Sequence, residues 1–341
     1  MRRTGALRLV ANSNWRRGRL LILGYHGVAI EDEHEWDGSL YLRADDLEAR
    51  LRLLQKERYS VLGLDDAVRR LRAGTLPERS AALTFDDGYF DFLARAYPLL
   101  ASYRMPATVY LSTYYSTHNH PVFNVVCSYL LWKGRRGRLA TAALAKPGGP
   151  SFDLSRPGER AGALAWLKQF AREAGLNGDE KDDLAARLAG ALGVDWEELL
   201  SKRILHLLKP AEVGQLSACG VDFELHTYRH RVPREGRAFR DEIVRNRQDL
   251  AAMTGKTAAH FCYPSGDYAP EFLPWLTELG VETATTCRPG IATRSSHPLL
   301  LPRLIDSANL TMLEFESWLS GAGSLLPRRP GAGMPGAYEG A

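Results

Sequence analysis

The sequence predicts an α/β protein built on a parallel sheet, either open or closed into a barrel. Short apolar runs that resemble buried strands alternate with helical patterns in the first and last thirds of the 341-residue chain. Repeated strand–helix units of this kind are typical of parallel sheets. Two polar motifs directly follow two of the apolar runs, and α/β enzymes build their sites at the carboxyl ends of strands.

The first part of the alternation begins with a strand expected at 20–25, where the residues form a continuous apolar run. A helix is expected next, because Leu47, Leu51 and Leu54 recur at helical spacing. The later elements are a strand at 59–62, a helix from an N-cap at Asp65 to a stop at Gly74, a strand at 81–85, a helix at 92–103 and a strand at 107–112.

The second part of the alternation resumes at residue 221. Strands are expected at 221–225, 259–263, 281–286 and 299–305, with helices at 239–253 and 270–279. Between the two parts, residues at about 114–208 break the rhythm and predict a helical insertion. The resulting domain prediction is a basic segment at 1–19, a barrel at 20–320 carrying that insertion, and a Gly/Pro-rich tail at 321–341 that we expect to be disordered.

The net charge of +4 is mild, and much of the excess lies in the first 19 residues. We interpret this segment as solvated, with contact to an anionic membrane surface as the alternative. No nucleic-acid-binding signature accompanies it. No apolar run reaches the about 18 residues of a transmembrane helix and no Sec-type signal is apparent, so we expect a cytoplasmic protein, with a position peripheral to the inner membrane left open.

The two polar motifs carry the chemistry. Asp86 and Asp87 follow the apolar run at 81–85, and His226 and His230 follow the run at 221–225. One aspartate and two histidines can form a facial triad on a metal ion and leave positions open for water and substrate. The remaining aspartate can then act as a base toward that water. The pattern predicts a metal-dependent hydrolase.

The strings Thr84-Phe85-Asp86-Asp87-Gly88 and His226-Thr227-Tyr228-Arg229-His230, in this order, resemble the polysaccharide deacetylases of the NodB-homology group, carbohydrate esterase family 4. The resemblance spans roughly residues 20–319 apart from the insertion. It implies a distorted (β/α)7 barrel. It also implies that Asp86 is the general base and that Asp87, His226 and His230 hold a divalent ion, with Zn²⁺ as the usual metal.

The chain departs from the family pattern at two places. Leu301-Pro302-Arg303 stands where many members carry the histidine that acts as acid, and Cys262 stands where an arginine contacts the base. His26, in a Tyr-His-Gly-Val string like that of the exopolysaccharide deacetylase branch, is therefore the expected acid. Tyr263 and Pro264 are expected to line the substrate pocket. Arg303 is expected to contact substrate or to supply the missing positive charge beside Asp86.

The expected function is removal of N-acetyl groups from an N-acetylated sugar or polysaccharide with release of acetate, in surface-glycan or exopolysaccharide biosynthesis. The expected partner is an N-acetylated glycan or oligosaccharide. Two alternatives stay open. One is a deacylase of a small non-sugar amide on the same scaffold, which would have a narrow pocket. The other is a metal-bearing protein that binds glycan without cleaving it, although such a protein would not need a base beside its metal.

Overall fold

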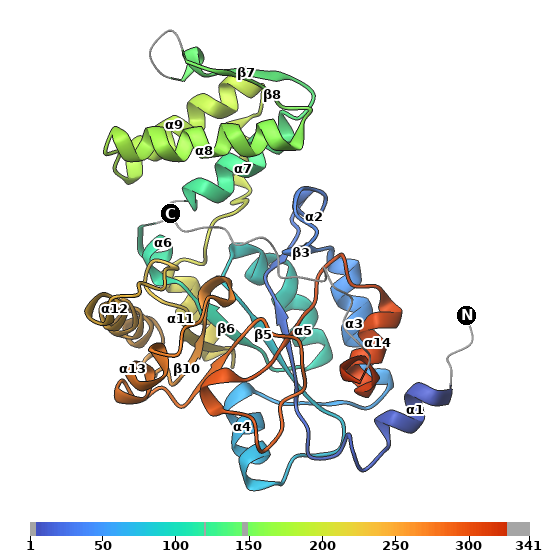
Figure 1. The fold of residues 1–341 in the computed structure, drawn as a ribbon. Helices are drawn as coiled ribbons and strands as arrows, with labels where there is room; N and C mark the ends of the chain where they lie inside the picture. Colours follow the sequence, from blue (N-terminus) through green and yellow to red (C-terminus); the bar gives the residue numbers. More distant parts are fainter. Residues whose placement is uncertain (1–4, 119–120, 145–148, 326–341) are drawn as a thin grey trace. The chain divides into compact units, whose positions relative to one another are not determined.

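The computed structural model describes residues 5–118, 121–144 and 149–325, and its described part contains two compact units. One unit is formed by the chain up to Tyr114 and from Leu208 onward, and the other by Tyr115–Leu207 (Figure 1). The first unit carries the parallel sheet. It consists of two stretches of chain, one before and one after the second unit in the sequence. Each unit is therefore described separately.

The first unit contains a curled parallel sheet that forms a half-barrel, in agreement with the predicted fold class. Its strands are β1 (Leu21–Tyr25), β5 (Ser80–Phe85), β6 (Thr108–Leu111), β9 (Asp222–Leu225), β10 (His260–Cys262), β11 (Thr283–Thr285) and β12 (Leu304–Ile305). Their spatial order is β11-β10-β9-β6-β5-β1-β12, and β4 (Ser60–Val61) pairs with β5. Backbone bonds from Leu301 N to Ala284 O (2.8 Å) and from Thr286 N to Leu301 O (2.9 Å) bring the segment before β12 back to β11.

The register of the strands brings their carboxyl ends to one edge. Tyr25 at the end of β1 pairs with Phe85 at the end of β5, and Leu111 at the end of β6 pairs with Leu225 at the end of β9. Leu225 in turn pairs with Phe261 of β10. The residues that follow β1, β5 and β9 therefore emerge at the same edge of the sheet, with β6 between β5 and β9, although they are far apart in sequence.

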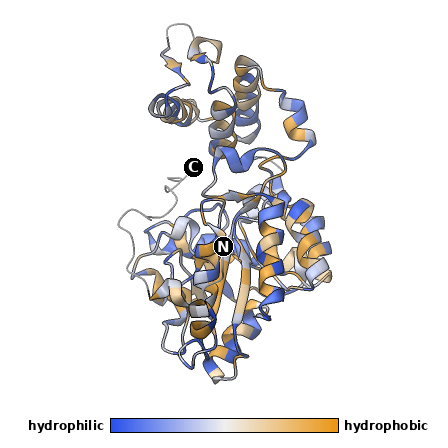
Figure 2. Ribbon diagram, turned by 90° about the vertical axis from the view of Figure 1, so that its right-hand side faces the viewer, coloured by the Kyte–Doolittle hydropathy of each residue, from blue (hydrophilic) through white to orange (hydrophobic). Residues whose placement is uncertain are grey.

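Helices with one apolar face surround this sheet. They are α1 (Gly5–Ala11), α2 (Glu33–Trp36), α3 (Ala44–Lys56), α4 (Leu64–Ala73), α5 (Tyr97–Tyr103), α11 (Pro210–Ala218), α12 (Gly236–Thr254), α13 (Phe272–Glu278) and α14 (Met312–Ser320). In α3 the predicted stripe of Leu47, Leu51 and Leu54 is fully buried. Figure 2 shows strands coloured mainly as hydrophobic and helices that alternate between the two colours, as burial of one helix face requires.

The N-terminal segment is more than the solvated basic stretch expected at 1–19. The Arg16 side chain is buried and donates to three backbone oxygens, those of Leu319 (3.2 Å), Arg19 (2.5 Å) and Ser80 (3.1 Å). It thereby ties the segment to both β5 and α14. Within the described ranges, every helix is too short or too polar to cross a bilayer.

The second unit is mainly helical, as its sequence predicts. Its main helices are α7 (Phe123–Lys133), α8 (Pro157–Glu173), α9 (Gly178–Leu192) and α10 (Trp196–Ser201), and α6 (Thr113–His118) leads into it. The buried face of α7 packs against α8 and α9. A two-stranded antiparallel pair, β7 (Arg138–Ala140) and β8 (Ser151–Asp153), was not predicted.

Glu224 on β9 makes the stability of the barrel depend on pH. Its Oε2 accepts the N–H groups of Ala259 (2.8 Å) and His260 (2.7 Å), which start β10. Burial raises the pKa of Glu224 to about 8, against the lowering effect of these N–H groups. Between about pH 4.5 and pH 8 the folded state therefore keeps a proton that the unfolded chain has released, and the free energy of unfolding falls as pH rises through this window.

Glu224→Gln is expected to remove this contribution, because an amide oxygen can accept the same two bonds without carrying charge. Melting temperatures of the variant and the parent, measured from pH 5 to pH 9, should diverge as the parent loses stability. Glu173→Gln, on the exposed side of α8, is the matched control. Parallel curves for Glu224→Gln and the parent would show that Glu224 does not titrate in this window.

Candidate active site

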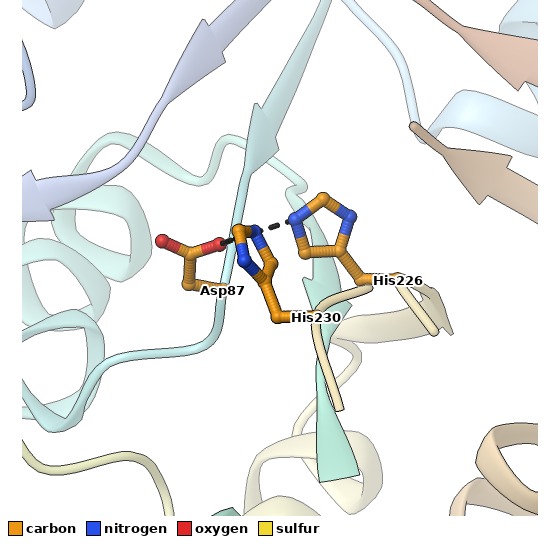
Figure 3. A group of neighbouring side chains, drawn as sticks. All are labelled: Asp87, His226 and His230. Carbon is orange, nitrogen blue, oxygen red and sulfur yellow. Dashed lines mark hydrogen bonds and ion pairs between the residues drawn. The ribbon is translucent and has the colours of Figure 1, made fainter. Parts of the chain in front are cut away.

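The structure brings Asp87, His226 and His230 together at the carboxyl edge of the sheet. The Asp87 Oδ1 atom lies 3.1 Å from His226 Nε2 and 3.2 Å from His230 Nε2. One ligand atom from each of these residues lies within 4.8 Å of the others. Figure 3 shows the carboxylate, which follows β5, facing the two imidazoles, which follow β9. The expected convergence of two distant motifs is therefore present in the geometry.

The backbone at these motifs adopts a conformation that non-glycine residues rarely take. Asp87 has a φ of 69°, Thr227 of 63° and His230 of 56°. Left-handed backbone at a β-branched residue such as Thr227 is especially unfavourable, and such residues persist only where surrounding contacts hold them. These three turn residues direct the two imidazoles and the carboxylate toward one point.

Helix α12 supplies the contacts that hold the second motif. The Asn246 side chain accepts the N–H of His226 (2.9 Å) and donates to the Leu111 carbonyl (2.9 Å), so it links β6 to β9 at their ends. One turn earlier, Glu242 accepts the N–H of Arg229 (2.7 Å). Sequence reasoning did not identify Glu242 or Asn246. Two features of the sequence could have identified them. The two residues lie four positions apart, and Asn246 stands among the apolar residues of the buried face of α12.

The donor set fits a divalent cation. His226 Nδ1 lies 2.9 Å from the Cys262 carbonyl, which can only accept, so Nδ1 carries a proton. Nε2 and Asp87 Oδ1 share a hydrogen bond in this structure, and a cation would take the place of the Nε2 proton between them. With bonds of about 2.1 Å, neighbouring ligand atoms stand about 3.0–3.4 Å apart, and the two distances to Asp87 Oδ1 fall in this range. A carbonyl behind a ligating imidazole is also the usual orienting partner.

The same proximity shifts the acid–base equilibria of the cluster. Burial would raise the pKa of Asp87, but the charge and hydrogen bonds of His230 and His226 hold it well below its usual range. Burial lowers the pKa of His230, whereas Asp87 raises it more, so the net shift is upward. The carboxylate is thus ionised at neutral pH, as a metal ligand must be.

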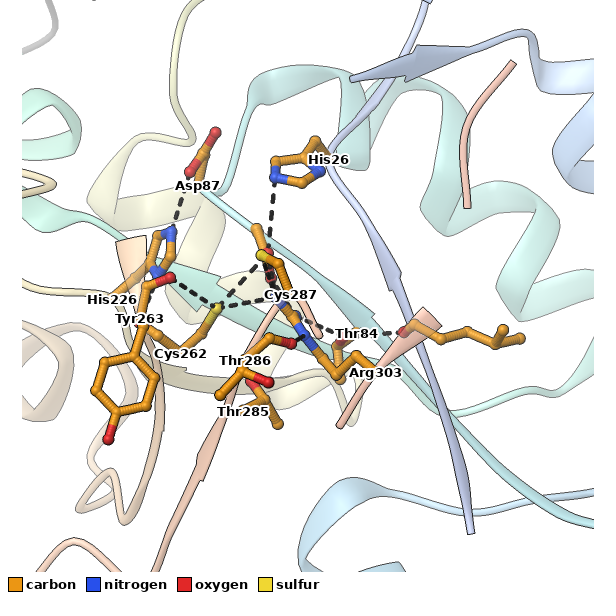
Figure 4. A network of polar contacts seen from close by, with 12 residues as sticks. His26, Thr84, Asp87, His226, Cys262, Tyr263, Thr285, Thr286, Cys287 and Arg303 are labelled. Carbon is orange, nitrogen blue, oxygen red and sulfur yellow. Dashed lines mark hydrogen bonds and ion pairs between the residues drawn. The ribbon is translucent and has the colours of Figure 1, made fainter. Parts of the chain in front are cut away.

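Asp86 lies directly beside the triad and is held by Arg303. The two Nη atoms of Arg303 lie 2.7 Å from the two carboxylate oxygens of Asp86, and the side chains are 0% and 2% exposed. Burial would raise the pKa of Asp86, but the Arg303 charge lowers it below the usual value. His26, which follows β1, places Nε2 3.7 Å from Asp86 Oδ2 and is 14% exposed (Figure 4).

The residues that we expected to contact substrate, Tyr263, Pro264 and Arg303, lie in the interior of the first unit. Tyr263 is fully buried and donates its hydroxyl to the Leu299 carbonyl (3.0 Å), and Pro264 is buried as well. Arg303 is also fully buried. In this structure Tyr263 and Pro264 pack in the interior, and their contact with substrate stays a prediction. Arg303 pairs with Asp86, which is the second of its two expected roles.

Comparison with known families identifies the class of protein. The family described as "Polysaccharide deacetylase" matches residues 73–145 and 174–284, which is more than half of the chain. These ranges contain Asp86, Asp87, His226 and His230. The chain belongs to the polysaccharide deacetylase family.

Individual relatives are more distant. The poly-β-1,6-N-acetyl-D-glucosamine N-deacetylase of Escherichia coli K12 is 30% identical over 100 residues, which are 29% of this chain and only 15% of that protein. Among solved structures, the deacetylase PplD of Streptococcus pyogenes, in complex with acetate, has a TM-score of 0.58 at 18% identity and covers 91% of this chain and 99% of its own. IcaB of Ammonifex degensii has a TM-score of 0.54 at 14% identity, with coverages of 89% and 97%. Both share the fold.

Proposed function

We propose that this chain is a divalent-metal-dependent hydrolase that removes N-acetyl groups from a glycan and releases acetate. One observation carries the proposal: Asp87, His226 and His230 converge on one point, and the separate carboxylate of Asp86 lies next to them. The spare carboxylate is what distinguishes a hydrolytic centre from a metal site that only binds. The family membership and the similarity to an N-acetylglucosamine polymer deacetylase support a sugar acetamide as substrate, in surface-glycan or exopolysaccharide biosynthesis.

Asp87, His226 and His230 would hold the ion, and Zn²⁺ suits a set of two imidazoles and one carboxylate. A divalent cation there would supply Lewis-acid activation of water and of the acetamide carbonyl. Asp86 is ionised and aimed at the same edge, so it removes the proton of the attacking water. The amide nitrogen leaves poorly as an anion and needs a proton.

We assign the delivery of that proton to His26. It is partly exposed at the site, whereas the side chain at the position of the usual C-terminal histidine is the buried Arg303. Its Nδ1 has no hydrogen-bond partner among the described residues, so no bond to another side chain or to the backbone holds this nitrogen. Asp86 and His26 thus form a neighbouring base and acid, with His26 Nε2 3.7 Å from Asp86 Oδ2.

Acetate release tests the proposal directly. β-1,6- and β-1,4-linked N-acetylglucosamine oligomers are incubated with the purified chain after exhaustive chelation and again after reloading with Zn²⁺. We expect acetate and free amine in equal amounts from the reloaded protein only. Full activity in a chelated sample whose metal content is confirmed to be negligible would contradict the metal role. Absence of acetate from every oligomer with the metal bound would contradict the deacetylase assignment.

A further inference from the structure

Every N–H group of the Arg303 guanidinium has a hydrogen-bond acceptor in the site. Besides the two bonds to Asp86, Nε donates to the Thr286 carbonyl (3.1 Å), Nη1 to Thr84 Oγ1 (3.2 Å) and Nη2 to Cys262 Sγ (3.1 Å). All five N–H donors of an arginine therefore have an acceptor. A group held in this way has one orientation, and Figure 4 shows it reaching from the segment before β12 across to the network around Cys262.

Gly24 on β1 leaves the room for this group. A Cβ at position 24 would stand 3.3 Å from Arg303 Nη1, 3.4 Å from Arg303 Cζ and 2.7 Å from Ile305 Cδ1. The Ile305 atom is the end of a flexible side chain and can move. The guanidinium cannot, because its five bonds fix it. Position 24 must therefore stay small for the carboxylate to keep its partner.

Cys262 on β10 occupies the other approach to the same carboxylate. Its Sγ lies 3.6 Å from Asp86 Oδ2 and 3.1 Å from Arg303 Nη2. A long cationic side chain at position 262 would reach the carboxylate from the β10 side, where it would meet the guanidinium that is already there. Two like charges cannot share this buried space, so a cation at one position requires a small neutral residue at the other.

We propose that an arginine at either residue 262 or residue 303 can pair with Asp86 and fix its orientation. In this chain, the small residues Gly24 and Cys262 leave room only for the arginine at 303. Arg303 is a positioning residue: it fixes both oxygens of a buried carboxylate and touches no substrate. Its loss should lower kcat and leave KM and metal content nearly unchanged. The kinetic part of this inference rests on the proposed function, whereas the structural part does not.

The proposal is tested by moving the arginine from residue 303 to residue 262. Arg303→Met should lower kcat by about 100-fold, the loss typical of a misplaced reacting group, and should lower the melting temperature because Asp86 is left buried without its partner. Cys262→Arg alone should also lower the melting temperature. The double variant Cys262→Arg/Arg303→Met should be more stable than the sum of the single losses and should regain at least about tenfold in kcat over Arg303→Met. Cys219→Arg, at an exposed cysteine, should behave like the parent.

Gly24 provides a second test that does not need the exchange to fold. In the variant Gly24→Ala/Ile305→Val the clash with Cδ1 is removed and only the contact with the guanidinium remains. It should lower kcat several-fold when Arg303 is present and have no further effect beside Arg303→Met. Equal effects of Gly24→Ala/Ile305→Val in both backgrounds would overturn the inference, as would a double exchange variant no better than the worse single one. The parent could release no acetate while the melting temperatures of Cys262→Arg and Arg303→Met are still non-additive. In that case the deacetylase proposal fails, and the proposal that residues 262 and 303 are alternative positions for the arginine holds.

Discussion

His230→Ala is expected to lose its metal and its deacetylase activity together. His230 contributes one of the three candidate ligands, and its side chain is 30% exposed at the end of a loop, so its removal leaves the barrel core intact. Changes to groups that only orient a ligand typically cost about 10–100-fold in metal affinity, and loss of a ligand itself should exceed this. Titration with Zn²⁺, elemental analysis after gel filtration and acetate release measure the two losses.

His118→Ala is the control for this experiment, because His118 is exposed and lies outside the cluster. It should bind metal and act like the parent. If His230→Ala bound Zn²⁺ with the parent's affinity, His230 would not be a ligand, and the convergence of Asp87 and the two imidazoles would need another explanation. A normal melting temperature for the apo form of His230→Ala would exclude general unfolding as the cause of its losses.

Asp86→Asn is expected to keep the metal and lose about 10²–10⁴-fold in kcat, the range for removal of a general base. The amide has nearly the same shape but cannot take a proton from water. The ligands at 87, 226 and 230 are unchanged, so Zn²⁺ affinity should stay within a few-fold of the parent. Metal titration and steady-state kinetics with the same protein sample separate binding from chemistry.

Asp91→Asn is a matched control for Asp86→Asn. Burial, with the charges of Glu33 and Asp87, raises the pKa of Asp91 well above the usual value, against the effect of the Val28 N–H that it accepts (3.1 Å). The neutral form of this carboxyl is therefore favoured, and an amide closely replaces that form. Asp91→Asn should be nearly as active as the parent. Full activity of Asp86→Asn would instead remove Asp86 as the base.

The candidate ligands could be predicted because each motif follows a buried strand directly. Parallel strands place their carboxyl ends at one edge, so Asp87 and the pair His226 and His230 had to lie near one another once the sheet formed. The residues that support them could not be predicted in the same way. Asn246 and Arg303 act across the fold, and the direction of each side chain depends on packing that local sequence does not specify.

The boundaries of the elements show the same division between local and long-range causes. Gly74 ends α4 in a left-handed conformation with a φ of 73°, as glycine chemistry predicts. Asp65, in contrast, lies in the first turn of α4, where Gly63 is the N-cap, so the predicted cap is wrong by two positions. The strand expected at 299–305 shrinks to Leu304–Ile305, because Pro298 and Pro302 have no N–H to donate to a neighbouring strand.

The structure describes some parts of the predicted domain organisation and not others. Residues 326–341, most of the expected tail, lie outside the described residues. Arg16 shows why charge alone is a weak guide to exposure, since backbone oxygens satisfy its guanidinium in the interior. In the insertion, Tyr129 is buried and its ring stacks on that of Trp132 with centroids 5.9 Å apart, so these aromatic residues form part of the insertion's own core.

The two points at which the chain leaves and re-enters the barrel have a consequence for engineering. The N–H of Tyr114 bonds to the Tyr228 carbonyl (2.9 Å), and the N–H of Leu208 bonds to the Gly88 carbonyl (2.9 Å). Both anchors therefore bond to the loops that carry the candidate metal ligands and Asp86. The connections of the 115–207 segment are thus fastened by backbone bonds inside the barrel, which makes Tyr114 and Leu208 the points at which this segment can be shortened or exchanged without a change in the strands.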